Sequence, residues 1–146
     1  MTEEARDAFL ARFSSANEET LVGLAVMGGV FGEGIDLVGE RLIGVVVVGV
    51  GLPQLGLEGD LIKEYFDRDT GSGFAYAYQY PGFNRVLQAT GRVIRTDTDR
   101  GIIVLIDERF TNARYRLLFP AHWSGYQVVK NTREMKDKLA HFWSRK

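Results

Sequence analysis

The stretch LIGVVVVGV, residues 42–50, decides the fold class. Valine is branched at Cβ and favours β structure, and a long run without charge suits a strand that is buried on both faces. Two other runs have the same character: TLVGLAVMGG, residues 20–29, and GIIVLID, residues 101–107. We predict a buried strand in each of the three.

Helical patterns lie between these runs and at both ends of the chain. We predict helices over residues 3–13, 58–69, 81–95, 112–119 and 132–143. Pro81 suits the first turn of its helix, and Asn131 with Glu134 resembles a capping box at the start of the last one. Apolar strands that alternate with helices indicate an α/β domain with a parallel sheet. The first helix has no strand before it, so the chain resembles part of such a domain.

Composition excludes several kinds of site. The chain has 146 residues, a formal net charge of -1, no cysteine and two histidines. The lack of cysteine removes disulfides, thiolate nucleophiles and cysteine-ligated metals. His122 and His141 stand far apart without a metal-ligand pattern around them. We therefore expect no metal site in this chain.

The sequence gives no sign of a membrane or export segment. Its first residues, MTEEARDAFLARF, are charged and lack the apolar core of a signal peptide. The longest uncharged run, residues 42–57, is shorter than the roughly 18–20 residues that a membrane helix needs. We expect a soluble, cytoplasmic protein.

The stretch QATGRVIR, residues 88–95, is the first candidate site. If the helix over residues 81–95 continues through it, Gln88, Gly91, Arg92 and Arg95 share one stripe, because a helix turns by about 100° per residue. A guanidinium is permanently charged and forked, and therefore suits phosphate oxygens. Gly91 would leave room for a ligand to approach the backbone. A solvated basic face with an incidental glycine explains the spacing equally well.

The loop GGVFGEGIDLVG, residues 28–39, is the second candidate site. It follows one predicted strand and precedes another, so it belongs at the carboxyl end of a parallel sheet, where ligands of open α/β folds bind. Its glycines would let backbone amides turn toward a ligand, and Glu33 and Asp36 would supply acceptors. Taken alone, a tight connection stabilised by Asp36 explains it better.

The sequence lacks two common phosphate-binding motifs. GVGLPQ, residues 49–54, begins like a dinucleotide fingerprint but has no third glycine and contains a proline. No glycine is followed by lysine, so the G-x-x-x-x-G-K-[ST] phosphate loop is not present. A small Rossmann-type enzyme is accordingly disfavoured.

Together the two candidate sites resemble a known family. VFGEGIDLVGERL, residues 30–42, looks like helicase motif V, and QATGRVIR fits Q-x-x-G-R-x-x-R, motif VI of superfamily 2 helicases. YPGFNRVLQATGRVIRTDTDRGIIVLIDERF and the later FPAHW are similar to the DinG-type branch, relatives of the XPD-type DNA helicases. The resemblance covers residues 20–123 and implies a partial RecA-like domain.

In this family, ATP and Mg²⁺ bind between two RecA-like domains, and the first supplies the phosphate loop and the acidic motif. The resemblance therefore implies that residues 1–146 are the C-terminal portion of the second domain, without its N-terminal strands. It implies ATP and Mg²⁺ in the intact protein, held mainly by the missing first domain, and neither in this chain alone. The isolated chain is expected to be inactive.

The resemblance also implies roles for individual residues. Arg95 would be the arginine finger that reaches the γ-phosphate, Arg92 would contact the same phosphates, and Gln88 would position the attacking water or the finger. The residues that it places at the nucleotide are Glu33, Gly34, Asp36 and Gly91. It places Phe31 and Gly32 at nucleic acid. Arg85, Arg114 and Arg116 are candidates for gripping the DNA backbone, although an ordinary surface charge explains each of them better.

The leading hypothesis is therefore half of an ATP-dependent DNA helicase of the kind used in DNA repair. Its partners would be single-stranded or forked DNA and the first helicase domain. An exposed sheet edge also predicts self-association of the isolated chain. The alternative is a non-catalytic α/β module that binds nucleic acid or a protein and uses the arginines as a phosphate clamp.

Overall fold

The computed structural model describes residues 2–31, 37 and 39–144. The chain divides into two compact units, Met1–Arg116 and Leu117–Lys146, and we describe each by itself. Within the described ranges, no helix is both long and apolar enough to cross a membrane.

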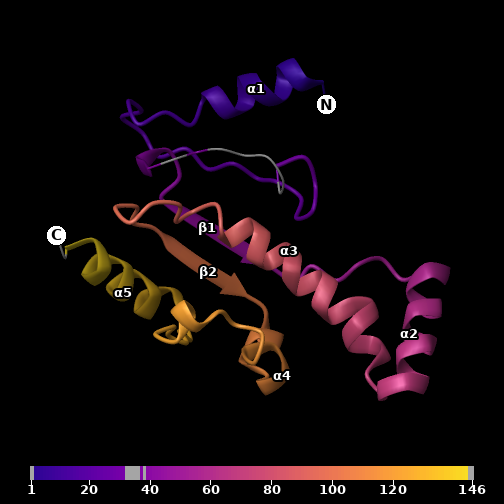
Figure 1. Ribbon diagram of the computed structural model, residues 1–146. Helices are drawn as coiled ribbons and strands as arrows, with labels where there is room; N and C mark the ends of the chain where they lie inside the picture. The colour runs from indigo at the N-terminus through magenta and orange to yellow at the C-terminus, as the bar shows by residue number, and fades with distance from the viewer. Residues whose placement is uncertain (1, 32–36, 38, 145–146) are drawn as a thin grey trace. The chain divides into compact units, whose positions relative to one another are not determined.

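The first unit is built on two parallel strands. β1 (Gly44–Val48) pairs with β2 (Ile102–Ile106), in register from Gly44 opposite Ile102 to Val48 opposite Ile106 (Figure 1). One further hydrogen bond at each end, Ile102 N to Ile43 O and Gly49 N to Ile106 O, both 3.0 Å long, extends the pairing. Two of the three predicted strands and the parallel α/β class are confirmed. The arrangement is that of a partial RecA-like domain.

β1 is buried on one face only, which corrects the prediction of burial on both. Val47 is buried, whereas Val46 and Val48 on the opposite face are 61% and 70% exposed. The helix α3 (Tyr80–Thr90) packs against β1 on the buried side. A strand is buried on both faces only where a layer of structure covers each face of its sheet. Among the described residues of the first unit, no layer covers the face that carries Val46 and Val48.

Residues 20–29 do not form the predicted strand. This segment has no strand pairing in the described part of the chain, and Val22, Leu24 and Val26 are exposed. A strand is completed by ladder hydrogen bonds to a neighbour, so an apolar sequence is not sufficient to make one. The segment ends in a turn, where Gly29 N donates to Val26 O at 3.0 Å.

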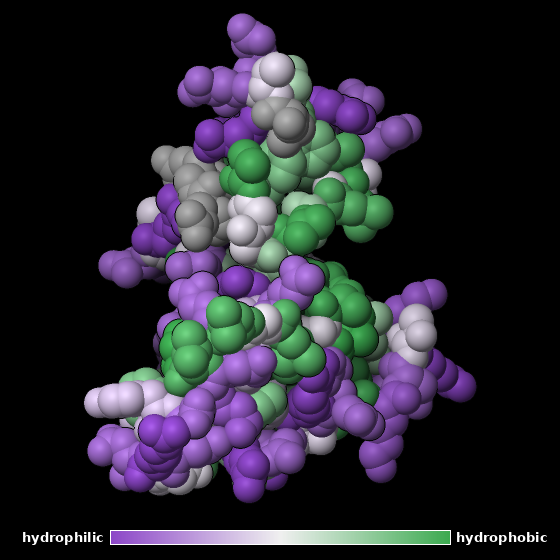
Figure 2. Space-filling model, turned by 90° about the vertical axis from the view of Figure 1, so that its right-hand side faces the viewer, coloured by the Kyte–Doolittle hydropathy of each residue, from purple (hydrophilic) through white to green (hydrophobic). Residues whose placement is uncertain are grey.

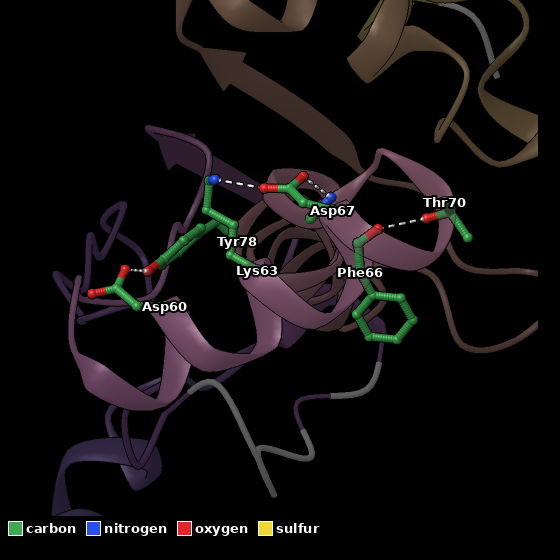
Figure 3. Close-up of polar contacts among 7 residues, drawn as sticks. Asp60, Lys63, Phe66, Asp67, Thr70 and Tyr78 are labelled. Atoms are coloured by element: carbon green, nitrogen blue, oxygen red, sulfur yellow. Dashed lines mark hydrogen bonds and ion pairs between the residues drawn. The ribbon is translucent and has the colours of Figure 1, made fainter.

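The predicted helix over residues 58–69 is confirmed as α2 (Leu57–Thr70), which ends at Gly71 in the left-handed conformation. A π-helical stretch, η2 (Ala75–Gln79), follows and leads directly into α3. Asp67 joins α2 to the residues just before η2, because its carboxylate accepts from Lys63 Nζ at 2.6 Å and from Gly73 N at 2.7 Å (Figure 3). The hydrogen bond from Lys63, followed by that from Gly73, lowers the pKa of Asp67.

Aromatic side chains complete the contact between α2 and η2. The rings of Phe66 and Tyr76 stack with centroids 4.0 Å apart. The Tyr78 hydroxyl donates to Asp60 at 3.2 Å (Figure 3). Burial and the hydrogen bond to Asp60 raise the pKa of Tyr78. These contacts fix the direction in which the chain enters α3.

The core of the first unit lies where α3 meets the end of β1. Phe83, Val86 and Val50 are its most buried side chains, and Val86 is completely inaccessible to solvent. Gly82 on α3 faces Gly51, which follows β1, and a Cβ on either residue would come within 2.8 Å of a backbone oxygen of the other segment. Glycine at both positions therefore allows the two backbones to approach closely.

At its N-terminus the chain begins with α1 (Glu3–Ala11), capped by Thr2, whose hydroxyl accepts from Ala5 N at 3.3 Å. α1 confirms the predicted first helix and ends two residues earlier than expected. Its Phe9 ring lies 4.8 Å from that of Phe31.

Beyond β2, Asp107 accepts from Arg109 Nε and Nη2, each at 2.8 Å, and from Arg109 N at 2.9 Å. It caps the 3-10 helix η3 (Glu108–Thr111), which is followed by α4 (Ala113–Arg116). The helix predicted over residues 112–119 is thus a single turn.

The second unit contains the 3-10 turn η4 (Ala121–Trp123) and the helix α5 (Thr132–Ser144). The predicted capping box is confirmed in one of its two hydrogen bonds, because Glu134 N donates to Asn131 Oδ1 at 2.9 Å. The Glu134 side chain accepts instead from Lys130 N, one residue before the cap, at 3.0 Å. The rings of Trp123 and Tyr126 each lie 5.3 Å from that of Phe119.

Candidate functional site

The candidate site starts where α3 ends. Thr90 is the last helical residue, and its hydroxyl hydrogen-bonds to the carbonyl oxygens of Val86 at 2.9 Å and Leu87 at 3.1 Å. Gly91 N still donates to Leu87 O at 2.8 Å, and Val93 N then donates to Thr90 O at 3.2 Å, which is a tighter turn. The helix predicted to continue to residue 95 therefore stops five residues earlier.

The end of α3 at Thr90 changes how the residues of the QATGRVIR stretch are exposed. Gln88 is exposed on α3, Arg92 is half-buried in the turn after it, and Arg95 is exposed beyond the turn. The single helical stripe predicted for these side chains is wrong, because the amides after Val93 leave the helical pattern. An amide and two guanidiniums nevertheless remain within eight residues of chain, on either side of one tight turn.

Gly91 occupies the end of α3 with an ordinary helical φ of -65°. A Cβ there would lie 3.1 Å from the Leu87 carbonyl oxygen, closer than most real Cβ contacts. Gly91 is also exposed. Its placement at the nucleotide stays a prediction.

Asp99, which no sequence motif singles out, organises the chain at Arg95. Asp99 Oδ2 accepts a hydrogen bond from Arg95 N at 2.8 Å and another from Thr96 N at 2.9 Å. Asp99 N donates in return to Thr96 O at 3.2 Å. The hydrogen bond from the Arg95 amide, with those from Thr96, lowers the pKa of Asp99. The stretch TDTDRG, residues 96–101, contains two aspartates that its sequence does not distinguish, and only the hydrogen bonds single out Asp99.

Arg85 is held at a junction of three segments. Its Nη1 donates to Gly51 O at 3.2 Å, and its Cδ and Nε lie 3.2 Å from where a Cβ of Gly28 would be. Gly28 has a φ of +77°, which favours glycine. Arg85 thus ties α3 to the loop after β1 and to the start of the second candidate loop. Its predicted role at nucleic acid stays a prediction.

Half of the second candidate loop, residues 32–36 and 38, lies outside the described residues. The predicted site residues among them are Gly32, Glu33, Gly34 and Asp36. Phe31 is half-buried beside Phe9, and Arg41, which follows the loop, donates from Nε to Phe13 O at 2.8 Å. The loop is therefore anchored at both ends to residues of α1 and the segment after it.

The described side chains offer donors and positive charge, which suit an anionic ligand better than a metal ion. No group of three or more His, Cys, Asp or Glu that could hold a metal occurs in the part of the chain that the structure describes. The guanidiniums of Arg92 and Arg95 and the amide of Gln88 can bind phosphate oxygens. Arg114 and Arg116 lie on α4 at exposed positions.

Comparison with known proteins gives a family match over residues 1–126, to the helicase C-terminal domain. A probable ATP-dependent helicase of Methanocaldococcus jannaschii is 31% identical over 144 residues, which is 92% of this chain and 20% of that protein. The ATP-dependent DNA helicase DinG of Photobacterium profundum is 33% identical over 89 residues, 60% of this chain and 13% of DinG.

A vertebrate protein is similar to this chain to about the same degree. The regulator of telomere elongation helicase 1 of Bos taurus is 32% identical over 127 residues, 81% of this chain and 10% of that protein. The chain thus spans a fifth or less of the length of these relatives.

Proposed function

The chain belongs to the helicase C-terminal domain family of DinG-type, XPD-like helicases, and from this we propose that it supplies motifs V and VI to an ATP-dependent DNA helicase. In this proposal residues 1–146 are the C-terminal portion of a second RecA-like domain. ATP and Mg²⁺ bind mainly to a first helicase domain that the chain does not contain. The partners are that domain and single-stranded or forked DNA.

The observation that carries the proposal is the display of motif VI at the end of α3. Gln88 and Arg95 are exposed on either side of the turn that contains the half-buried Arg92. Phosphoryl transfer develops charge on the γ-phosphate, and an arginine reaching that phosphate from the opposite domain stabilises the charge. We assign this role to Arg95, contact with the same phosphates to Arg92, and positioning of the water or of the finger to Gln88.

The second candidate loop completes the proposed active site. Glu33, Gly34, Asp36 and Gly91 would contact or flank the nucleotide, while Phe31, Gly32 and Arg85 would face the DNA. Arg85 supports a connection between the two functions, because it joins α3 to the loop after β1 beside Gly28. ATP binding and hydrolysis would close and open the two domains, and this cycle would move the protein along single-stranded DNA.

An ATPase assay with single-stranded DNA tests the proposal. We expect the isolated chain to give no turnover, because it has no phosphate loop. The longer protein that carries both domains should hydrolyse ATP and should do so faster with DNA. Robust turnover by the isolated chain, unchanged by Arg95→Ala, would falsify the assignment.

Fluorescence anisotropy with labelled single-stranded DNA separates the proposal from the non-catalytic binding module. A binding module predicts tight, salt-sensitive binding by the isolated chain, reduced by Arg92→Ala and by Arg95→Ala. The helicase proposal predicts that these two substitutions act on ATP hydrolysis and leave the DNA affinity of the intact protein within about threefold, a spread of less than 1 kcal/mol.

A further inference from the structure

The loop between α3 and β2 is closed at its ends. Val93 is buried at its start, and Gly101 at its end lies so near that a Cβ on Gly101 would be 2.1 Å from Val93 Cγ1. The same Cβ would be 3.2 Å from Ile43 O, beside the first residue pair of the sheet. The loop therefore leaves the core at Val93 and re-enters it beside the same point at Gly101. Arg95 and Asp99 lie between these two residues.

Inside this closed loop the Asp99 carboxylate accepts a hydrogen bond from the backbone amide of Arg95. One oxygen, Oδ2, accepts from two successive amides, at 2.8 Å from Arg95 N and 2.9 Å from Thr96 N. Both distances are those of strong hydrogen bonds to an ionised acceptor. Thr96 adds a contact between its hydroxyl and that of Thr98 at 3.1 Å.

Fixing the Arg95 backbone matters because its side chain is long. Arg95 lies outside any helix or strand, so neither a helical nor a sheet hydrogen-bond pattern sets the direction of its Cα–Cβ bond. A small change of backbone angle at this residue moves the guanidinium by ångströms, and a misplacement of about 1 Å can cost about 10²-fold in rate.

We propose that Asp99 is a positioning residue for Arg95: by accepting hydrogen bonds from the Arg95 and Thr96 amides, it aims the Arg95 guanidinium at the phosphate that it stabilises. This inference rests on the proposed function of Arg95. It adds Asp99 as the residue that fixes the backbone of Arg95. Asp99 acts through Arg95 and does not itself touch the nucleotide.

The first experiment uses the chain alone and measures amide hydrogen exchange by NMR. Asp99→Ala should remove protection at the Arg95 and Thr96 amides while the ladder amides of β1 and β2 keep theirs. Asp97→Ala, an exposed carboxylate in the same turn, is the matched control and should change neither. Unchanged protection at Arg95 in Asp99→Ala would overturn the proposal.

The second experiment measures DNA-stimulated ATP hydrolysis by the intact protein. Asp99→Ala should lower kcat by about 10²-fold and leave KM for ATP within about twofold, because positioning affects the transition state more than ground-state binding. Asp99→Asn keeps one carbonyl oxygen as an acceptor and should recover most of the lost kcat. A kcat for Asp99→Ala within twofold of the wild type contradicts the proposal.

A double-mutant cycle decides whether Asp99 works through Arg95. Once Arg95 is alanine, adding Asp99→Ala should lower kcat no further, since the group that Asp99 positions is gone. Losses that multiply would mean an independent, structural role and would overturn the inference. If Arg95→Ala alone leaves kcat unchanged, the proposed function fails. If Arg95→Ala lowers kcat and Asp99→Ala does not, only this inference fails.

Discussion

At Asp99, a single carboxylate oxygen holds two successive amides, and this arrangement has a consequence for stability in acid. The hydrogen bonds from Arg95 and Thr96 lower the pKa of Asp99 in the folded chain. The pKa values of Asp67 and Asp107 are also lowered, mainly by hydrogen bonds from Lys63 and Arg109, respectively. A carboxyl group whose pKa is lower in the folded state stabilises that state above its unfolded pKa, near 3.9, and loses this effect as the pH falls through the folded value.

We therefore predict that the Tm of the chain is highest well above pH 4 and falls as the pH drops below about 4 toward the lowered pKa values of these carboxyl groups. Asp99→Asn should lower Tm at pH 6 and reduce the difference between pH 6 and pH 2. Differential scanning calorimetry at the two pH values measures this. Asp97→Asn in the same turn is the control. An equal pH dependence in Asp99→Asn and in the wild type would refute the role of Asp99 in acid stability.

Two glycines after β1 give a matched test of the close approach between β1 and α3. Gly49 and Gly51 both have positive φ, +87° and +67°, but a Cβ on Gly49 meets nothing within 4 Å, whereas one on Gly51 would be 2.8 Å from Gly82 O. Gly49→Ala should cost about 1 kcal/mol from backbone strain alone. Gly51→Ala should cost clearly more, because the α3 backbone must also shift.

Urea unfolding of the two variants, followed by circular dichroism, measures the difference in unfolding free energy. Equal losses in Gly49→Ala and Gly51→Ala would show that the contact between the segments adds nothing to the strain.

At the scale of elements, local patterns predicted well what depends on neighbouring residues alone. The valine run of β1, the helix α2 and the Asn131–Glu134 cap of α5 follow from propensity and capping, and the structure confirms all three. Residues 20–29 have equally strong strand character. They nevertheless form no strand in the structure, because ladder pairing depends on a partner segment that local sequence does not specify.

In the candidate site, too, some features follow from the local sequence and others depend on how distant segments fold. Its residues could be selected from the sequence, since Q-x-x-G-R-x-x-R is a compact pattern. Their arrangement could not, because α3 ends at Thr90 and Asp99 then captures the amides of Arg95 and Thr96. Both TDTD carboxylates had the same local sequence signal, and only the path of the loop distinguishes Asp99 from Asp97.

For the whole molecule, the exposed apolar surface predicts self-association of the isolated chain. Val46 and Val48 stand exposed on the open face of the sheet, and apolar side chains are visible at the surface in Figure 2. In the part of the chain that the structure describes, the sheet has two strands, and another copy can extend its outer edges. We expect light scattering to show dimers or larger species at micromolar concentration.

Val48→Lys should shift this equilibrium toward monomer, because it places a charge on the open face. Leu117→Lys is the control, since Leu117 is 85% exposed but lies in the second unit. A monodisperse wild-type monomer would contradict the prediction, as would an equal effect of both substitutions.

We propose that this chain provides an arginine finger to a helicase whose phosphate loop lies in another domain. DNA-stimulated ATP hydrolysis by the intact protein tests this directly when Arg95→Ala is compared with Arg100→Ala, an exposed arginine in the same loop. We expect Arg95→Ala to lower kcat by roughly 10³-fold or more with little change in ATP affinity, and Arg100→Ala to stay near wild type. A kcat for Arg95→Ala equal to that of Arg100→Ala would contradict this proposal.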